Sequence, residues 1–463
     1  MERKYAWHNY DEQTLQDVMS LGDSYRQFLD NGKTERECVV QSVAVAKEAG
    51  YVDLKELIKS NTPIKAGDKI YYTHMDKSIA LFYIGTDDMD LGMNILGAHI
   101  DSPRIDVKQN PQYEDSNLVF WDTHYYGGIK KYHWVAMPLA IHGVVVKTDG
   151  TRININIGDK ETDPVFCITD LLPHLGQEQM QKNAAKVIEG ESLDLLIGSQ
   201  PVKGEEKEGV TKFINALLEK EYGFVERDLL SAELEIVPAG KARDMGFDRS
   251  MIIAYGQDDR VCAYTSLVAM LEVDKVKRTT CCLLVDKEEI GSVGATGMQS
   301  RFFENAVAEI LTLMGKPNSV NVRRTLENSR MLSSDVSAGY DPLYASAFEK
   351  KNASYLGMGV VFNKFTGSRG KAGSNDANAE YMGFIRRVME ANNVTYQTAE
   401  LGKVDLGGGG TIAYIMALYG MNVIDCGVAV LSMHAPWEVT SKADIYEAKR
   451  CYVAFLNAAD KII

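Results

Sequence analysis

The stretch TTCCLLVDKEEIGSVGATG, residues 279–297, places two adjacent acids directly after an apolar run. Residues 281–285 form a short apolar run, which is typical of a buried strand. Glu288 and Glu289 follow this run and precede a series of glycines. Two neighbouring carboxylates repel each other unless a positive group lies beside them. The pattern therefore predicts a cation at the end of this strand.

Other apolar runs also end in a histidine or an acid. They contribute His99 in ILGAHIDSPR, Asp258 and Asp259 in MIIAYGQDDR, Asp335 in RMLSSD and His434 in AVLSMHAPWE. Any one of these residues is equally well explained as a solvated surface group. Ligands of open α/β sheets bind beyond the carboxyl ends of the strands, however, so several such strand ends together predict one common site.

His99 and Asp101 are two residues apart, and side chains at that spacing on a strand point the same way. A carboxylate that holds one imidazole nitrogen is the usual partner of a metal-bound histidine, and a surface His–Asp pair is the alternative. The other histidines are interpreted as surface or structural residues. They are His8, His74, His124, His133, His142 and His174.

Two histidines and three carboxylates suit two divalent ions. Zinc binds such ligands at about 2.0–2.2 Å, and manganese and cobalt accept the same ligand types. One acid of the pair Glu288 and Glu289 is then left over, and an acid that does not bind the metal is placed to take a proton from metal-bound water. We therefore expect two metal ions at the strand end, with one glutamate as ligand and the other as general base.

The bulk composition argues against nucleic-acid and membrane partners. The chain has 463 residues, a formal net charge of −14 and a sequence pI near 5.2, which disfavours nucleic acid and anionic membrane surfaces. The N-terminal MERKYAWHNYDEQ lacks the apolar core of a signal peptide. Seven cysteines without CxxC spacing indicate a reducing compartment, so we expect a cytoplasmic protein.

Strands and helices alternate on both sides of a β-rich insertion. Helical periodicity covers residues 12–58, with Thr34 opening the second helix. The insertion contains GVVVKTDGTRININIGD, a hairpin pattern with Asp149 and Gly150 at the turn. After it, the pattern predicts strands at 280–285, 331–335 and 422–430 and helices at 298–314, 376–392 and 442–460.

The predicted fold class is therefore α/β, with a mostly parallel sheet sandwiched by helices and an inserted β-rich domain. Residues 1–107 and 246–463 would form a discontinuous catalytic domain, and residues 108–245 the inserted domain.

The ordered motifs GAHIDSP, DDR, DKEEIGS, SSDVSAG and SMHAPWE resemble the aspartyl-aminopeptidase family of dinuclear zinc exopeptidases. The resemblance covers essentially the whole chain, and it implies a fold of the zinc-exopeptidase type whose inserted domain mediates dimerisation and higher oligomerisation. It also implies individual roles for the residues in these motifs.

By this resemblance, His99 and Asp335 would bind one ion, and Glu289 and His434 the other. Asp258, rather than Asp259, would bridge the two ions. Glu288 would be the general base, and Asp101 would orient His99.

The implied activity is hydrolytic removal of N-terminal Asp or Glu from peptides, in a tetrahedral dodecamer that substrates enter through pores. In this family a histidine acts across a subunit contact, and His174 in LLPHLGQEQ is the candidate. Lys364, and after it Lys371, would pair with the substrate carboxylate, although solvated loop lysines explain both equally well. The glycine-rich segment VDLGGGGTIAYIMA is interpreted as a close-packed turn beside the metal site rather than an anion site.

Three alternatives stay open. The same metal pair would serve an aminopeptidase of neutral specificity or an amide deacylase. A catalytically silent scaffold held together by its ions is the third alternative, and Glu288 argues against it because a purely structural site needs no additional acid that does not bind the metal.

Overall fold

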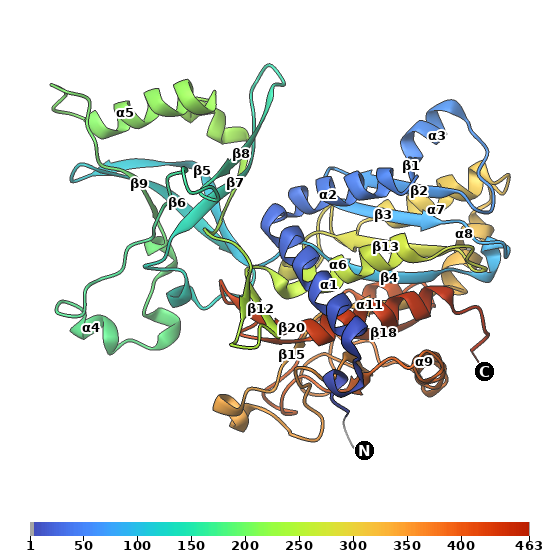
Figure 1. Ribbon diagram of the computed structural model, residues 1–463. Coiled ribbons are helices and arrows are strands. Elements are labelled where there is room, and N and C mark those ends of the chain that lie inside the picture. The colour runs from blue at the N-terminus through green and yellow to red at the C-terminus, as the bar shows by residue number, and fades with distance from the viewer. Residues whose placement is uncertain (1–3, 463) are drawn as a thin grey trace. The chain divides into compact units, whose positions relative to one another are not determined.

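A nine-stranded mixed sheet lies at the centre of the larger part of the chain in the computed structural model, which describes residues 4–462 (Figure 1). Its four neighbouring central strands run parallel: β13 (Thr280–Val285), β4 (Asn94–His99), β14 (Arg330–Ser334) and β18 (Asn422–Gly427). The outer strands are β1 (Val52–Asp53), β2 (Lys69–His74), β3 (Ser78–Tyr83), β16 (Val360–Asn363) and β17 (Tyr396–Thr398). The parallel centre brings the carboxyl ends of β13, β4 and β14 to one edge of the sheet.

Helices cover both faces of this sheet, as Figure 1 shows. One face packs against α1 (Glu12–Asn31), α2 (Glu35–Glu48), α6 (Gln257–Glu272), α9 (Ala379–Ala391) and α11 (Lys442–Asn457). The other packs against α3 (Leu54–Ser60), α7 (Phe302–Leu313), α8 (Ser319–Glu327) and α10 (Ala413–Ala417). The adjacent Cys281 and Cys282 point into different cores because neighbouring side chains of a strand face opposite ways. The predicted sandwich is confirmed.

The first helices begin where their capping residues predict. The Asp11 side chain accepts the N–H of Thr14 at the start of α1. Thr34 and Glu37 form a reciprocal capping box at the start of α2. Since each such cap stabilises a helix by about 1 kcal/mol, local sequence is enough to define these two starts.

A five-stranded sheet accompanies the large sheet in the same unit. It contains β11 (Arg243–Met245), β12 (Met251–Ala254), β20 (Glu438–Ser441), β19 (Ala429–Leu431) and β15 (Ser337–Ala338). The prediction of a single strand at 422–430 was wrong, because the chain forms two strands there, β18 of the large sheet and β19 of the small one. Both strands are mostly buried, so the sequence stays apolar from one to the other and gives no sign of the break between them.

A six-stranded antiparallel sheet forms the second unit. Its strands are β8 (Arg152–Ile157), β7 (Leu139–Val146), β10 (Ala232–Pro238), β5 (Arg104–Asp115), β6 (Leu118–Tyr126) and β9 (Leu195–Gly198), and it is accompanied by α4 (Gln177–Met180) and α5 (Gly209–Leu217). The predicted hairpin is confirmed: β7 pairs with β8, and Gly150 in the turn has a φ of 88°.

The first unit comprises Met1–Asp101, Ala242–Met433 and Glu438–Ile463, and the second comprises Ser102–Lys241 and His434–Trp437. The ends expected at residues 107 and 246 therefore differ from the observed ones by a few positions. β5 begins at Arg104 and pairs at once with β6, and this pairing is not visible in local sequence. Residues 1–3 and 463 of the expected catalytic domain lie outside the described residues.

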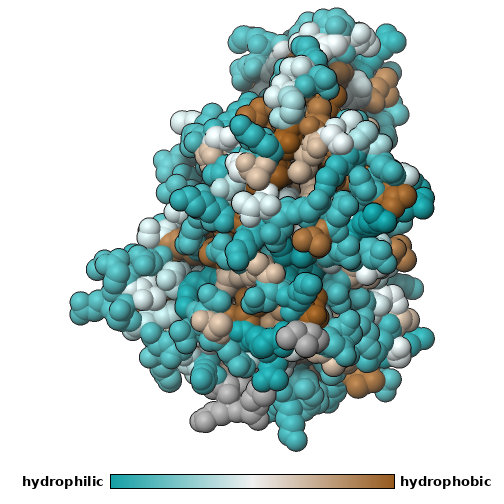
Figure 2. Space-filling view, turned by 90° about the vertical axis from the view of Figure 1, so that its right-hand side faces the viewer, coloured by the Kyte–Doolittle hydropathy of each residue, from teal (hydrophilic) through white to brown (hydrophobic). Residues whose placement is uncertain are grey.

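The face of the molecule shown in Figure 2 carries mainly hydrophilic residues, and its hydrophobic residues form separate groups. Within residues 4–462, none of the helices combines the length and the apolar character needed to cross a membrane.

Candidate metal centre

His99 and Asp101 form the buried base of the site. His99 is the last residue of β4, and its Nδ1 lies 3.0 Å from the carbonyl oxygen of Asp101 and 3.3 Å from Oδ1 of the same residue. A carbonyl oxygen only accepts, so Nδ1 carries the hydrogen and donates it. Nε2 is then the nitrogen that a metal would bind, as in other metal-bound histidines.

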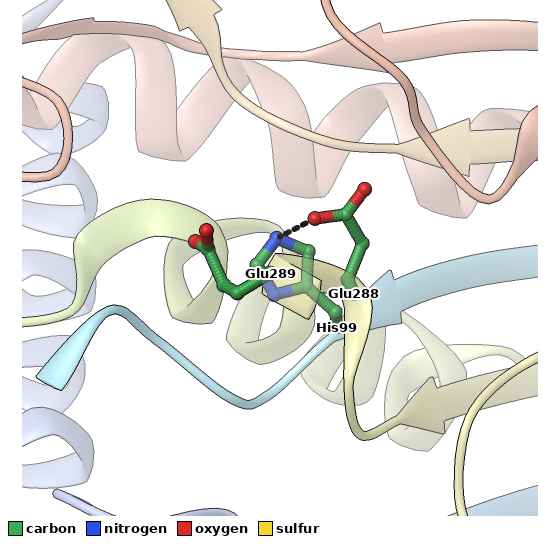
Figure 3. Close-up of side chains that lie close together, drawn as sticks. All are labelled: His99, Glu288 and Glu289. Atoms are coloured by element: carbon green, nitrogen blue, oxygen red, sulfur yellow. Dashed lines mark ion pairs between the residues drawn. The ribbon is translucent and has the colours of Figure 1, made fainter. Parts of the chain in front are cut away.

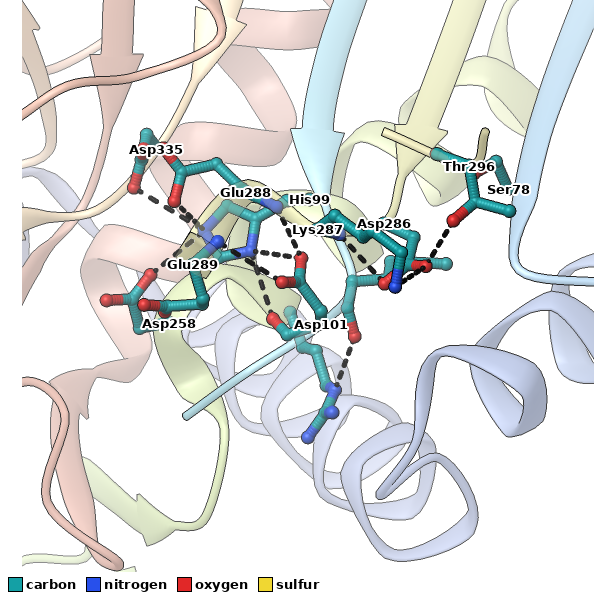
Figure 4. A network of polar contacts seen from close by, with 12 residues as sticks. Ser78, His99, Asp101, Asp258, Asp286, Lys287, Glu288, Glu289, Thr296 and Asp335 are labelled. Atoms are coloured by element: carbon teal, nitrogen blue, oxygen red, sulfur yellow. Dashed lines mark hydrogen bonds and ion pairs between the residues drawn. The ribbon is translucent and has the colours of Figure 1, made fainter. Parts of the chain in front are cut away.

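Carboxylates from different elements approach this Nε2 (Figure 4). The distance to Oδ1 of Asp258 is 3.2 Å, and the distances to Oδ1 of Asp335 and Oε2 of Glu288 are both 3.9 Å. Asp258 comes from the start of α6, Asp335 follows β14 and Glu288 follows β13. Residues far apart in the sequence thus meet around one imidazole.

Asp101 also fixes the two adjacent glutamates. Its Oδ1 accepts the N–H of Glu288 at 3.1 Å, and its Oδ2 accepts the N–H of Glu289 at 3.2 Å. Lys287 has a left-handed φ of 69° and turns the chain sharply after β13. Figure 3 shows the side chains of Glu288 and Glu289 beside His99. The sequence predicted only contact with His99 for Asp101, and its hold on the glutamate backbone is a further finding.

The two aspartates of DDR lie at the start of α6, and the prediction that they end a strand was wrong. β12 ends at Ala254 in the small sheet, and the chain then turns into α6. The Asp258–Asp259 peptide bond is cis. The Asp258 carboxylate faces His99, and its N–H donates to Glu438 at 3.0 Å.

The backbone of Asp335 is packed against Gly427. The Asp335 N–H donates to the carbonyl of Cys426 at 3.0 Å. A Cβ placed on Gly427 would lie 1.9 Å from the Asp335 carbonyl oxygen. Only glycine is therefore compatible with this approach, and it holds Asp335 against β18.

The electrostatics of the site favour a bound cation. Burial and the charge of Glu288 raise the pKa of Asp335 well above its usual range. Burial alone would lower the pKa of His99, but hydrogen bonds with Asp101 and Asp258 and the charge of Glu288 raise it overall. Both groups therefore bind a proton more tightly when no cation balances the acids.

The donor set fits zinc. His99, Asp258 and Asp335 each place a ligand atom within 4.8 Å of the others, and His99, Glu288 and Glu289 do the same. An imidazole nitrogen with several carboxylate oxygens is a ligand set that zinc accepts.

His434 belongs to the second unit and follows β19 in the chain. Its Nδ1 lies 2.8 Å from the carbonyl oxygen of Gly128 in the same unit, so Nδ1 donates there, and Nε2 would be the ligand nitrogen. Nδ1 of His99 likewise donates to a backbone carbonyl oxygen. The assignment of His434 as a metal ligand stays a prediction.

The remaining predicted substrate residues lie in exposed segments. Lys364 and Lys371 both pair with Asp376, the latter at 3.1 Å. β16 is antiparallel to β18, so the chain leaves β16 toward Lys364 in the direction away from the end that carries Asp335. His174 is exposed in the second unit. The roles of Lys364 and His174 stay predictions.

Two glycines of the glycine-rich segment make close backbone contacts, and the expected position of this segment beside the metal site stays a prediction. A Cβ on Gly407 would lie 1.6 Å from the Leu401 carbonyl oxygen, and one on Gly408 would lie 2.0 Å from that of Gly367. The Thr411 hydroxyl then donates to Asp425 of β18 at 2.6 Å.

The acid-lined site on this α/β fold fits a metal-dependent enzyme, and the comparisons with known proteins give its family. The model of the family described as aminopeptidase I zinc metalloprotease (M18) matches residues 28–456. The chain is 58% identical over 457 residues to a probable M18 family aminopeptidase 1 of Clostridium acetobutylicum, covering 98% of each chain.

Solved structures agree. An M18 aminopeptidase from Thermotoga maritima has a TM-score of 0.94 at 44% identity, covering 99% of both chains. Aminopeptidase I of Clostridium acetobutylicum has a TM-score of 0.92 at 57% identity, covering 99% of this chain and 100% of the other. The chain belongs to the M18 family of zinc aminopeptidases, which remove N-terminal residues from peptides.

We predict that zinc uptake by the metal-free protein releases protons at pH 7. The pKa values of His99 and Asp335 are raised, and a proton competes with the metal for each ligand atom, so zinc affinity rises as the pH is raised. Calorimetric titrations in two buffers of different ionisation enthalpy measure the proton count. An unchanged binding heat in the two buffers would contradict this expectation.

Proposed function

We propose that this protein removes N-terminal Asp or Glu from peptides with two zinc ions per subunit. The observation that carries the proposal is the meeting of His99, Asp258 and Asp335 around one position, with Glu288 beside them. Membership of a zinc aminopeptidase family supports the hydrolytic part directly.

His99 and Asp335 would hold one ion, Glu289 and His434 would hold the other, and Asp258 would bridge them. The hydrogen bonds from Nδ1 of each histidine to a backbone carbonyl support this assignment, because they fix the tautomer that a ligand needs. Chain connectivity supports it too, since His434 directly follows Met433 of the first unit.

Zinc in such a site supplies Lewis acidity and makes bound water acidic enough to lose a proton near neutral pH. Glu288 would take that proton and return it to the leaving amine. Its side chain is half-buried, and Asp101 holds its backbone, which would limit how far the base can move. Asp101 would act by positioning His99 and both glutamates rather than by touching the substrate.

Preference for acidic N-terminal residues requires a cation, because the chain carries a net charge of −14. Lys364 is the proposed cation, with Lys371 next, and family resemblance is the support for an acidic substrate. A second candidate function, removal of neutral residues, is favoured by one observation. Asp376 already pairs with both lysines and cancels part of their charge.

We further propose a cytoplasmic homo-oligomer, a tetrahedral dodecamer built through the second unit, which cell fractionation and mass measurement would test. Exposed apolar side chains lie near His174 in the sequence of that unit and would suit a subunit contact. They are Val165, Leu171, Leu172, Leu175 and Met180. Short peptides are the proposed partners, without nucleic acid or membrane.

We expect Glu288→Gln to lower kcat by about 10²–10⁴-fold while the bound zinc is retained, because the variant loses only the general base. Glu289→Gln is the matched control, since it changes the neighbouring acid and should lower zinc content as well. Steady-state kinetics together with elemental analysis of zinc distinguish the two. Near-normal turnover of Glu288→Gln would refute the assigned role.

A panel of aspartyl-, glutamyl-, leucyl- and N-acyl-anilides tests the substrate class. We expect the acidic substrates to have the highest kcat/KM, chelation to abolish all activity and zinc to restore it. Lys364→Ala should reduce the acidic preference, and Asp376→Asn should increase it by removing the competing carboxylate. Faster cleavage of leucyl-anilide by the unmodified enzyme would favour the neutral aminopeptidase.

Light scattering on a sizing column tests the assembly. We expect a mass of about twelve subunits for the unmodified chain and smaller species for Leu175→Glu and Met180→Glu, because a buried unpaired charge opposes association. Phe247→Glu is the control, as Phe247 is fully exposed in the first unit. A monomeric unmodified protein would exclude the proposed dodecamer.

A further inference from the structure

Arg260 is a buried arginine that contacts the backbone of the metal centre. It lies two residues after Asp258 and is 1% exposed. Its Nε donates to the carbonyl of Ile100 at 3.2 Å, and its Nη2 donates to the carbonyl of Lys33 at 2.9 Å. Its guanidinium carbon also lies 5.3 Å from the centre of the Tyr255 ring.

The contact with Ile100 matters because of where Ile100 lies. It separates His99 from Asp101, and its own N–H donates to the carbonyl of Val285 in β13 at 2.8 Å. The peptide segment 99–101 is thus held by β13 on one side and by Arg260 on the other. A shift of the Ile100 carbonyl would rotate both the His99 ring and the Asp101 carboxylate.

The hydrogen bond to the Lys33 carbonyl connects Arg260 to a further segment of the chain. Lys33 directly precedes Thr34, the capping residue of α2. One guanidinium therefore links three segments: the start of α6, the segment after β4 and the connection between α1 and α2. A lysine ammonium lacks the planar, forked donor geometry that makes this possible.

We propose that Arg260 is a positioning residue for the metal centre: it holds the Ile100 carbonyl and thereby sets the positions of His99 and Asp101. This inference rests on the proposed zinc site. It also predicts in which direction zinc affinity changes when Arg260 is replaced. A positive charge beside the acids by itself weakens cation binding, whereas correct positioning strengthens it. If positioning dominates, removing the arginine lowers zinc affinity.

Arg330 is a matched control. It is 3% exposed, donates to the carbonyls of Ala458 and Asp460 at 2.6 and 2.7 Å, and lies 4.1 Å from the centre of the Phe384 ring. It is the first residue of β14, at the end of that strand opposite to Asp335. It therefore makes the same kinds of contact away from the metal centre.

The test compares Arg260→Lys and Arg260→Gln with Arg330→Lys and Arg330→Gln. Zinc affinity is measured by competition with a chelator, and thermal unfolding is followed in parallel. We expect both Arg260 variants to bind zinc about 10–100-fold more weakly, as for other residues that support metal ligands. The Arg330 variants should lower the unfolding temperature and leave zinc affinity unchanged.

Unchanged or tighter zinc binding by Arg260→Gln would overturn the inference, and so would an equal loss in the Arg330 variants. If the Arg260 variants do not fold, Tyr255→Leu decides. That variant removes the supporting ring, so a weakening of zinc binding by about 2–5-fold is expected, and an unchanged affinity counts against the inference. An unmodified protein that binds no zinc would refute the proposed function instead.

Discussion

Repulsion among closely spaced acids is the constraint on which the centre of this protein depends. Asp258, Asp335 and Glu288 all place a carboxylate oxygen within 3.9 Å of one imidazole nitrogen. Ligand oxygens of Asp258 and Asp335 lie within 4.8 Å of each other, and two like charges about 4 Å apart repel by about 4 kcal/mol at an effective dielectric constant near 20. Protons or metal ions must balance them. The backbone must also resist being pushed apart, and the parallel strands, Asp101 and Gly427 provide that resistance.

Much of the fold could be predicted because it depends on local patterns. The apolar run at 280–285 coincides with β13, and Thr34 begins α2 as its capping box indicates. His99, Glu288 and Asp335 could be placed together because each lies at or within three residues of the carboxyl end of a strand in the sheet's parallel centre. The carboxyl ends of parallel strands share one edge, so sequence order alone predicts their meeting.

The rest depends on contacts that local patterns do not encode. An apolar run reports burial but not which sheet receives it, and so the division of residues 422–431 between two sheets was not predicted. Asp258 follows an apolar run, yet it enters the site from a helix start. The hydrogen bonds from the backbone of Glu288 and Glu289 to Asp101 join residues nearly two hundred positions apart, and nothing near either segment indicates them.

The absence of space for a Cβ at Gly427 limits how this centre can diversify among relatives. Because the Asp335 main chain lies against the bare glycine backbone and donates a hydrogen bond to Cys426, it cannot move closer to β18, and moving away would break that hydrogen bond. A descendant that required a different spacing between its ions could not obtain it by moving this strand. It would have to exchange one side chain for another of different length, so variation is expected in residue type while the main-chain path is inherited unchanged.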